Sequence, residues 1–331
     1  IVQAKRIYPL ISLIGNTAPI FSGITMSFIS NQIRKYSQND EIAFETSMKI
    51  LTGLMMVSGV VIASLHFYTR KLANEEALLD ANQQLLANPQ KQSGTNSTAH
   101  SKPKHPKMSL TDSIKVLASS KYLINVATMV LSYGLTIEFT EIIWKAAVKA
   151  AFPVKTDYLS FMGRYSTLVG SAAFVMMFVG ARVVKLLGWK AGALMTPLMM
   201  GLFAAPFFGC LIVKGTSSPT ALLAAVYIGL VANVLSKATK YAVFDPTKEM
   251  AYIPLDSNSK TKGKAAIDVL GARLGKSGGA LVQQILVLSF GNIFNGASIV
   301  AVCFYIVIAA WISKCFGLNV FSNLLIFLSL F

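Results

Sequence analysis

Apolar residues along this chain gather into blocks of about membrane-spanning length, and short basic segments separate the blocks. An α-helix rises about 1.5 Å per residue, so about twenty apolar residues cross the roughly 30 Å hydrocarbon core of a bilayer. The pattern therefore predicts eight spanning helices, at about residues 8–30, 44–68, 121–144, 158–181, 191–213, 219–244, 264–290 and 296–316. The apolar run that ends the chain is too short to be predicted as a further span.

A long hydrophilic segment separates the second span from the third. We predict that it contains an amphipathic helix at 70–88, a disordered linker rich in Ser, Pro, Lys and Asn at 89–107, and a second amphipathic helix capped by Ser109. The expected organisation is two helices at 1–68, a central loop at 69–120, a six-helix bundle at 121–316 and an apolar tail at 317–331.

Composition agrees with a polytopic all-α membrane protein. The chain is 54% hydrophobic and 13% charged, with a mean hydropathy of +0.57, whereas about a quarter of the residues in soluble proteins are charged. If the central loop is cytoplasmic, alternation of the spans puts about three times as many Lys and Arg on that side as on the other, as the positive-inside rule requires. The net charge of +16 therefore partly reflects topology and does not indicate a nucleic-acid partner. Trp144, Trp189 and Trp311 fall at predicted span ends, where an aromatic belt is expected.

Several charges lie inside predicted spans, where a lipid-exposed Lys, Arg or Asp costs about 2.5–3.5 kcal/mol. In the third span Glu138, Glu141 and Lys145 share one helical face. This stripe can line a transport pathway, or Glu141 and Lys145 can form an i,i+4 pair that only makes the span end tolerable. In the sixth span Lys237, Lys240 and Tyr241 lie near the cytoplasmic end, where the positive-inside rule alone explains them.

The seventh span carries two cations on one face, Arg273 and Lys276, among several glycines. The acidic neighbour on the same helix is Asp268, two turns earlier. Glycines let a ligand or another backbone come close, although helix packing alone also explains them. A deep Lys–Arg pair of this kind is typical of a site that binds a polyanion.

The segment GARLGKS at 271–277 superficially matches a phosphate-binding P-loop. It has three residues between the glycines instead of four, and a helix rather than a strand precedes it. We therefore exclude a P-loop ATPase. His66 is the one histidine outside the central loop, so the sequence also predicts neither a nucleophilic nor a metal-dependent enzyme, and we expect no cofactor.

Long segments of the chain resemble the nucleotide transporter family, the ATP/ADP antiporters of plastids and of obligate intracellular bacteria. The segments are QAKRIYPL, EIIWKAAVKAAFP, YLSFMGRYST, FDPTKEMAYIPLD, KGKAAIDV and LGKSGGALVQQ. The resemblance implies about twelve spans in an arrangement similar to the major facilitator transporters, of which this chain would hold spans five to twelve. The chain begins at Ile1 without a methionine or signal peptide, so we expect it to be a piece of a longer protein.

The resemblance also implies roles for particular residues. In the ATP/ADP exchangers an acidic residue of the E-x-x-W-K motif and the lysine of the GKSGG motif are needed for transport, and these correspond to Glu141 and Lys276. The implied mechanism is exchange of ATP for ADP by alternating access, with Lys276, helped by Arg273 or Lys240, binding the phosphates. Lys145, beside Glu141, joins this set of substrate-binding candidates. The apolar tail departs from the polar C-terminus that the family predicts.

Two other functions stay open. A relative with altered cargo or coupling can be an NAD/ADP exchanger or a proton-coupled nucleotide importer, and in the importer Glu138 or Asp268 can carry the proton. A non-transporting membrane scaffold or sensor is the more distant alternative. For the transporter we expect a monomer in the lipid bilayer, with phosphate or a proton as a further co-substrate. The Lys- and Asn-rich linker favours a bacterial inner membrane over a plastid inner envelope.

Overall fold

The structure is a computed structural model, and it describes residues 2–37, 39–87, 115, 118, 120–214, 218–255, 257–291 and 293–317. Within these ranges, some residues are placed by their backbone alone: 2–14, 16, 76–87, 181, 214, 257–261, 268–276, 279, 293, 316 and 317. The predicted linker at 89–107, the predicted cap at Ser109 and the tail beyond Gly317 lie outside the described residues.

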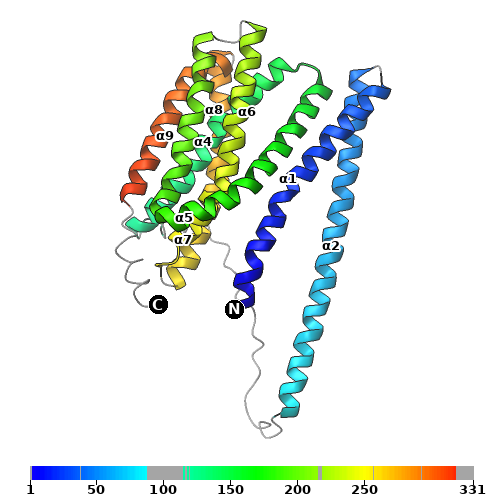
Figure 1. Cartoon of the computed structure of the whole chain (residues 1–331), viewed down its shortest axis with the longest axis vertical. Coiled ribbons are helices and arrows are strands. Elements are labelled where there is room, and N and C mark those ends of the chain that lie inside the picture. The colour runs from blue at the N-terminus through cyan, green and yellow to red at the C-terminus, as the bar shows by residue number, and fades with distance from the viewer. Residues whose placement is uncertain are drawn as a thin grey trace. The chain divides into compact units, whose positions relative to one another are not determined.

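The described residues form helices, and no strand occurs among them (Figure 1). This confirms the predicted all-α class. In chain order the elements are α1 Val2–Tyr36, α2 Asp40–Ala87, α4 Lys121–Ala151, α5 Lys155–Lys214, α6 Pro219–Thr239, the π-helix η1 Lys240–Phe244, α7 Asp245–Ala251, α8 Ser257–Phe290, the 3₁₀ helix η2 Ile293–Gly296 and α9 Ala297–Gly317.

Six helical stretches among the described residues are long and apolar enough to cross a membrane. They are Asp40–Glu75, Lys121–Ala151, Lys155–Gly180, Arg182–Val213, Pro219–Ala251 and Phe294–Cys315. The remaining two predicted spans coincide with α1 and α8, each of which includes residues placed by backbone alone. The chain is a multi-pass membrane protein.

The chain divides into two compact units. The smaller unit, Gln32–Lys107, contains the end of α1 and all of α2. Apolar side chains of α2 such as Met55 and Val60 are exposed, at 74% and 65%, as expected for a helix that faces lipid. The span predicted at 44–68 and the amphipathic helix predicted at 70–88 are continuous in α2.

The larger unit, Ile1–Asn31 with Met108–Phe331, contains the helix bundle that positions the candidate site. In it α4 packs against α6, α8 and α9, and α5 packs against α6 and α9 (Figure 1). Gly188 interrupts α5 with φ 81°, a left-handed conformation that favours glycine. This break separates the predicted spans at 158–181 and 191–213 and lets the second arm of α5 return along the bundle.

The tryptophans lie in the bundle interior instead of in an aromatic belt. Trp144, Trp189 and Trp311 are at most 5% exposed. Trp144 donates its indole N–H to the Val226 carbonyl and Trp189 donates to the Thr247 carbonyl, each at 2.9 Å. The belt prediction is wrong because helix packing buries all three rings, and the indoles of Trp144 and Trp189 find hydrogen-bond acceptors on neighbouring helices, which removes their need for water at the membrane surface.

Candidate functional site

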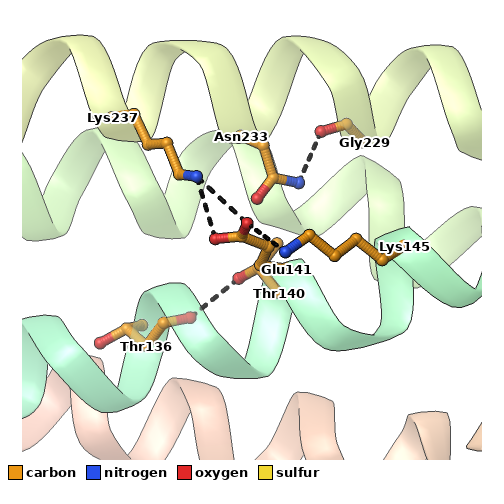
Figure 2. A network of polar contacts seen from close by, with 7 residues as sticks. All are labelled: Thr136, Thr140, Glu141, Lys145, Gly229, Asn233 and Lys237. Atoms are coloured by element: carbon orange, nitrogen blue, oxygen red, sulfur yellow. Dashed lines mark hydrogen bonds and ion pairs between the residues drawn. The ribbon is translucent and has the colours of Figure 1, made fainter. Parts of the chain in front are cut away.

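The charged centre of the bundle is Glu141, on the face of α4 that packs against α6 (Figure 2). Its side chain is 14% exposed. The Nζ of Lys237, on α6, lies 3.1 Å from each carboxylate oxygen of Glu141, and the Nζ of Lys145, one turn along α4, lies 2.8 Å from Oε1. One carboxylate therefore holds two ammonium groups, one from its own helix and one from a neighbour.

The two lysines differ in their access to solvent. The side chain of Lys145 is 46% exposed, whereas that of Lys237 is 23% exposed. The Lys237 ammonium also lies 5.2 Å from the ring centroid of Tyr165, a buried residue of α5, so a cation–π contact adds to the ion pair. We conclude that Lys237 is held inside the bundle by α4 and α5 together.

Close packing of α4 against α6 makes this inter-helix pair possible. A side chain at Gly229 of α6 would overlap the Trp144 ring of α4, so only glycine allows this approach. One turn on, Asn233 is fully buried and donates Nδ2 to the Gly229 carbonyl at 2.8 Å (Figure 2). Among the described residues, Asn233 Oδ1 and the Tyr165 hydroxyl are buried without a hydrogen-bond partner. A bound substrate or water could satisfy these two atoms.

The hydroxyls of α4 near Glu141 are already occupied. Thr140 donates to the Thr136 carbonyl at 3.0 Å (Figure 2), and Thr136 donates to the Ser132 carbonyl. Such bonds to the preceding turn satisfy a hydroxyl inside an apolar helix bundle. These threonines are therefore part of the helix, and the ionic groups beside them carry the chemistry.

A second lysine, Lys240, begins the π-helix η1 one turn after Lys237. Its Nζ lies 3.5 Å from Asp245 Oδ2, 4.4 Å from the ring centroid of Tyr241 and 5.7 Å from that of Tyr133 on α4. The Lys240 side chain is 27% exposed and that of Asp245 is 38% exposed. Lys237 and Lys240 thus each combine one carboxylate with aromatic rings.

The structure gives different outcomes for the predicted site residues. Glu141 and Lys145 do form the i,i+4 pair, and Glu141 also reaches across to α6, so neither reading of the α4 stripe is complete alone. Glu138 is half-buried one turn before Glu141. Lys240 joins a built ionic and aromatic environment, as described above.

The α8 candidates remain predictions. Asp268, Arg273 and Lys276 are on α8, but their side chains lie outside the described residues. The backbone of this region is next to α4, because a Cβ at Gly278 would be 3.3 Å from the Leu135 side chain. The helical turn that carries Lys276 therefore runs beside α4.

Lys237 is the residue whose role the sequence analysis missed. The positive-inside rule explained it as a loop anchor, which is wrong because its ammonium pairs with Glu141 inside the bundle. The available signal was the Glu141 charge itself, since a carboxylate within a span requires a cation and a second span offered one. Within the described part of the chain, no cluster of His, Cys, Asp and Glu is arranged to hold a metal ion.

Comparison with known proteins identifies the family. The chain is 38% identical over 318 residues to ADP,ATP carrier protein 1, chloroplastic, of Arabidopsis thaliana, covering 94% of this chain and 48% of the relative. It is 37% identical to ADP,ATP carrier protein 1 of Chlamydia pneumoniae and 33% identical to that of Rickettsia prowazekii, covering 96% of this chain and 61% and 62% of those relatives.

The chain therefore spans about half to three-fifths of the length of these relatives. No solved structure shows a significant match to it. A model of the TLC ATP/ADP transporter family matches residues 1–320, almost the whole chain. This chain belongs to the TLC ATP/ADP transporter family.

Proposed function

We propose that the full-length protein containing this chain exchanges ATP for ADP across its membrane by alternating access. Membership of the family supports this, as do the names of the relatives, which are ADP,ATP carriers. The observation that carries the proposal is the Lys237–Glu141 pair, in which a half-buried ammonium contacts both oxygens of a carboxylate inside the helix bundle.

The chemistry of this pair suits a phosphate substrate. A phosphate group offers a lysine the same kind of charged oxygen acceptors as a carboxylate, so the nucleotide can take the place of Glu141 at Lys237. When the Lys237 ammonium turns to the nucleotide, Glu141 keeps its 2.8 Å contact with Lys145. This remaining ion pair lowers the free-energy cost of a negative charge in the low-dielectric interior. Lys145 thus holds Glu141, and Lys237 binds the nucleotide.

Further phosphate contacts come from α8 in this proposal. Arg273 and Lys276 are three residues apart on one helical face, and the turn that carries them runs beside α4. Together with Lys237, these two cations would match the three or four negative charges of ADP and ATP. The side-chain oxygen of Asn233 and the Tyr165 hydroxyl, both buried without a hydrogen-bond partner among the described residues, would bind the rest of the nucleotide.

Exchange requires that the carrier cannot reorient across the membrane without a bound nucleotide. Otherwise the empty carrier would return, and net uptake would result. The Lys237–Glu141 ion pair links α4 to α6, and a nucleotide that binds Lys237 breaks this ion pair. A ligand drives a conformational change only through a difference in its binding free energy between two states, and this pair supplies one if it forms in only one of the two states. Only the loaded carrier then reorients. ATP and ADP differ by about one charge, so strict exchange moves net charge across the membrane unless phosphate or a proton accompanies it.

The test is uptake of radiolabelled ATP into proteoliposomes that hold the full-length protein, with and without internal ADP. We expect uptake only with ADP inside, and we expect Lys276→Ala to abolish it while the protein still inserts. Lys149→Gln, which removes an exposed lysine of α4 one turn beyond Lys145, is the matched control and should leave uptake unchanged. Uptake driven by a pH gradient without internal ADP would replace the exchanger with a proton-coupled importer. Unchanged transport by the Lys276 variant would remove that residue from the site.

A further inference from the structure

The span that carries both site lysines contains one wide turn. Residues 240–244 form the π-helix η1, and α6 and α7 continue on either side with helical backbone angles, −56° and −57° at Lys240 and −62° and −46° at Asp245. The stretch Pro219–Ala251 is therefore a single span with one π turn in it. Such single turns inside α-helices are rare and frequently occur at functional sites.

The sequence around η1 explains why the turn is wide. Pro246 has no N–H and cannot donate to the Ala242 carbonyl, four residues earlier. The N–H of Asp245 instead bonds the carbonyl of Lys240, five residues earlier, in the π pattern. Gly180 of α5 packs on this turn, and a Cβ there would lie 2.5 Å from the Ala242 carbonyl oxygen. A missing donor and a close-packed neighbouring helix together hold the π turn.

The π turn brings two side chains together that a regular helix would separate. Residues five apart are about 140° apart around an α-helix, on different faces. In η1 the same two residues that share the backbone bond also pair through their side chains, with Lys240 Nζ 3.5 Å from Asp245 Oδ2. Asp245 therefore reaches Lys240 because the helix is locally widened.

The Lys240 ammonium lies beside two tyrosine rings. It lies 4.4 Å from the Tyr241 centroid and 5.7 Å from that of Tyr133, and the Tyr133 ring stacks on the buried Phe244 at 5.1 Å. Lys237 precedes it by three residues in the same span, so the backbones of the two lysines are about 4.5 Å apart along the helix axis. Two lysines in succession, each paired with its own carboxylate, can each bind one phosphate group of a nucleotide.

We propose that Asp245 is a positioning residue that pairs with Lys240 across the π turn when no nucleotide is bound. When the nucleotide binds, Lys240 leaves Asp245 and contacts a phosphate group next to the one that Lys237 binds. The inference rests on the proposed ATP/ADP exchange and deepens it, because it assigns each of two lysines to one phosphate and gives each its own carboxylate. Asp245 acts on the substrate only through Lys240. It lowers the affinity of the loaded site and thereby speeds release.

The experiment compares five variants of the full-length protein by ATP/ADP exchange in proteoliposomes and by binding of labelled ATP in detergent. Asp245→Asn keeps the side-chain shape and removes the competing charge, so we expect the KM for ATP and the maximal rate both to fall about fivefold. Lys240→Gln should raise the KM about tenfold. The double variant should match Lys240→Gln alone, because Asp245 has no route to the nucleotide once Lys240 is neutral.

Glu249→Gln is the matched control. It removes a carboxylate of α7 that pairs with Lys264 at 2.7 Å and is 49% exposed, so a general gain of positive potential would appear there as well. We expect no change in KM or rate. Asp245→Glu should keep part of the wild-type behaviour, since the carboxylate remains. A merely structural role for Asp245 would raise the KM or lower the amount inserted, and would not lower KM and rate together.

Three results would overturn the proposal. One is a higher KM in Asp245→Asn, another is an equal effect of Glu249→Gln, and the third is an Asp245→Asn effect that persists beside Lys240→Gln. Failure of the proposed function reads differently. If the wild-type protein binds ATP without exchanging it for ADP, the exchanger is wrong, and the affinities of the same variants still decide the role of Asp245. If the wild-type protein binds no ATP, both proposals are wrong.

Discussion

Lys237 and Lys240 are one turn apart on the same span, but one pairs with a carboxylate of another helix and the other with a carboxylate of its own span. Lys237 pairs with Glu141 of another helix, across 96 residues of sequence, at 3.1 Å and with 14% of the Glu141 side chain exposed. Lys240 pairs with Asp245 of its own span, at 3.5 Å and with 38% of the Asp245 side chain exposed. The first pair joins two helices, and the second belongs to one helix with a widened turn.

The difference predicts different consequences when a charge is lost. Removing one partner of a buried pair leaves an uncompensated charge in a medium of low dielectric, whereas a more exposed charge is compensated by solvent. The Glu141–Lys237 pair should therefore affect both stability and transport. The Asp245–Lys240 pair should affect the affinity for the substrate and the rate, and stability less than the first pair does, because Asp245 holds one cation where Glu141 holds two.

The largest effect is expected from Glu141→Gln, which leaves Lys237 and Lys145 without their shared carboxylate. Exchange should fall at least about a hundredfold, and stability in detergent should fall by about 2–4 kcal/mol. Thermal unfolding and proteoliposome uptake measure the two effects. In Glu141→Gln with Lys237→Gln, the stability should recover because no buried charge is left unpaired there, while exchange stays lost. A double variant as unstable as the single one would show that the pair is not the cause.

The next effect separates the two cations that Glu141 holds. Lys237→Gln should lower exchange about thirtyfold, because this half-buried ammonium binds phosphate in our proposal, and Lys145→Gln should lower it about threefold, because its side chain is 46% exposed. Uptake at subsaturating ATP measures both. Equal losses in the two variants would contradict the assignment of separate roles.

The smallest effect is expected where α5 packs against the π turn at Gly180. Gly180→Ala places a Cβ 2.5 Å from the Ala242 carbonyl oxygen, so we expect a loss of about 1–3 kcal/mol in stability and a raised KM for ATP as Lys240 shifts. Gly209→Ala, on the same helix with nothing within 4 Å of the added Cβ, is the control and should be neutral or slightly stabilising. Equal behaviour of the two variants would mean that the π turn tolerates displacement.

The sequence predicted several charged residues of the candidate site, but it did not predict which of them pair with each other between helices. A carboxylate at Glu141 within a span had to have a partner, and its own helix offered Lys145. The choice of Lys237 as the second partner depends on α4 and α6 lying close together, which Gly229 and Trp144 decide in three dimensions. Lys276 and Arg273 remain predictions of the sequence, since their side chains are outside the described residues.

The π turn shows the same limit at short range. Pro246 is visible in the sequence and predicts an interrupted hydrogen-bond pattern. Proline in a span can also produce a kink or a helix end, and the packing of α5 at Gly180 selects the widened turn among these outcomes. The pairing of Lys240 with Asp245 follows from that selection.

The sequence by itself determined the all-helical membrane class, the approximate positions of the spans and the resemblance to nucleotide transporters. These depend on local apolar runs matched to the bilayer thickness and on short motifs, and both are properties of neighbouring residues. Tertiary structure alone decided that the tryptophans are buried, that Glu141 joins α4 to α6, and that Lys240 meets Asp245. The reason is physical: a charge or an indole inside a span takes whichever partner helix packing brings within reach, and packing depends on residues far apart in the chain.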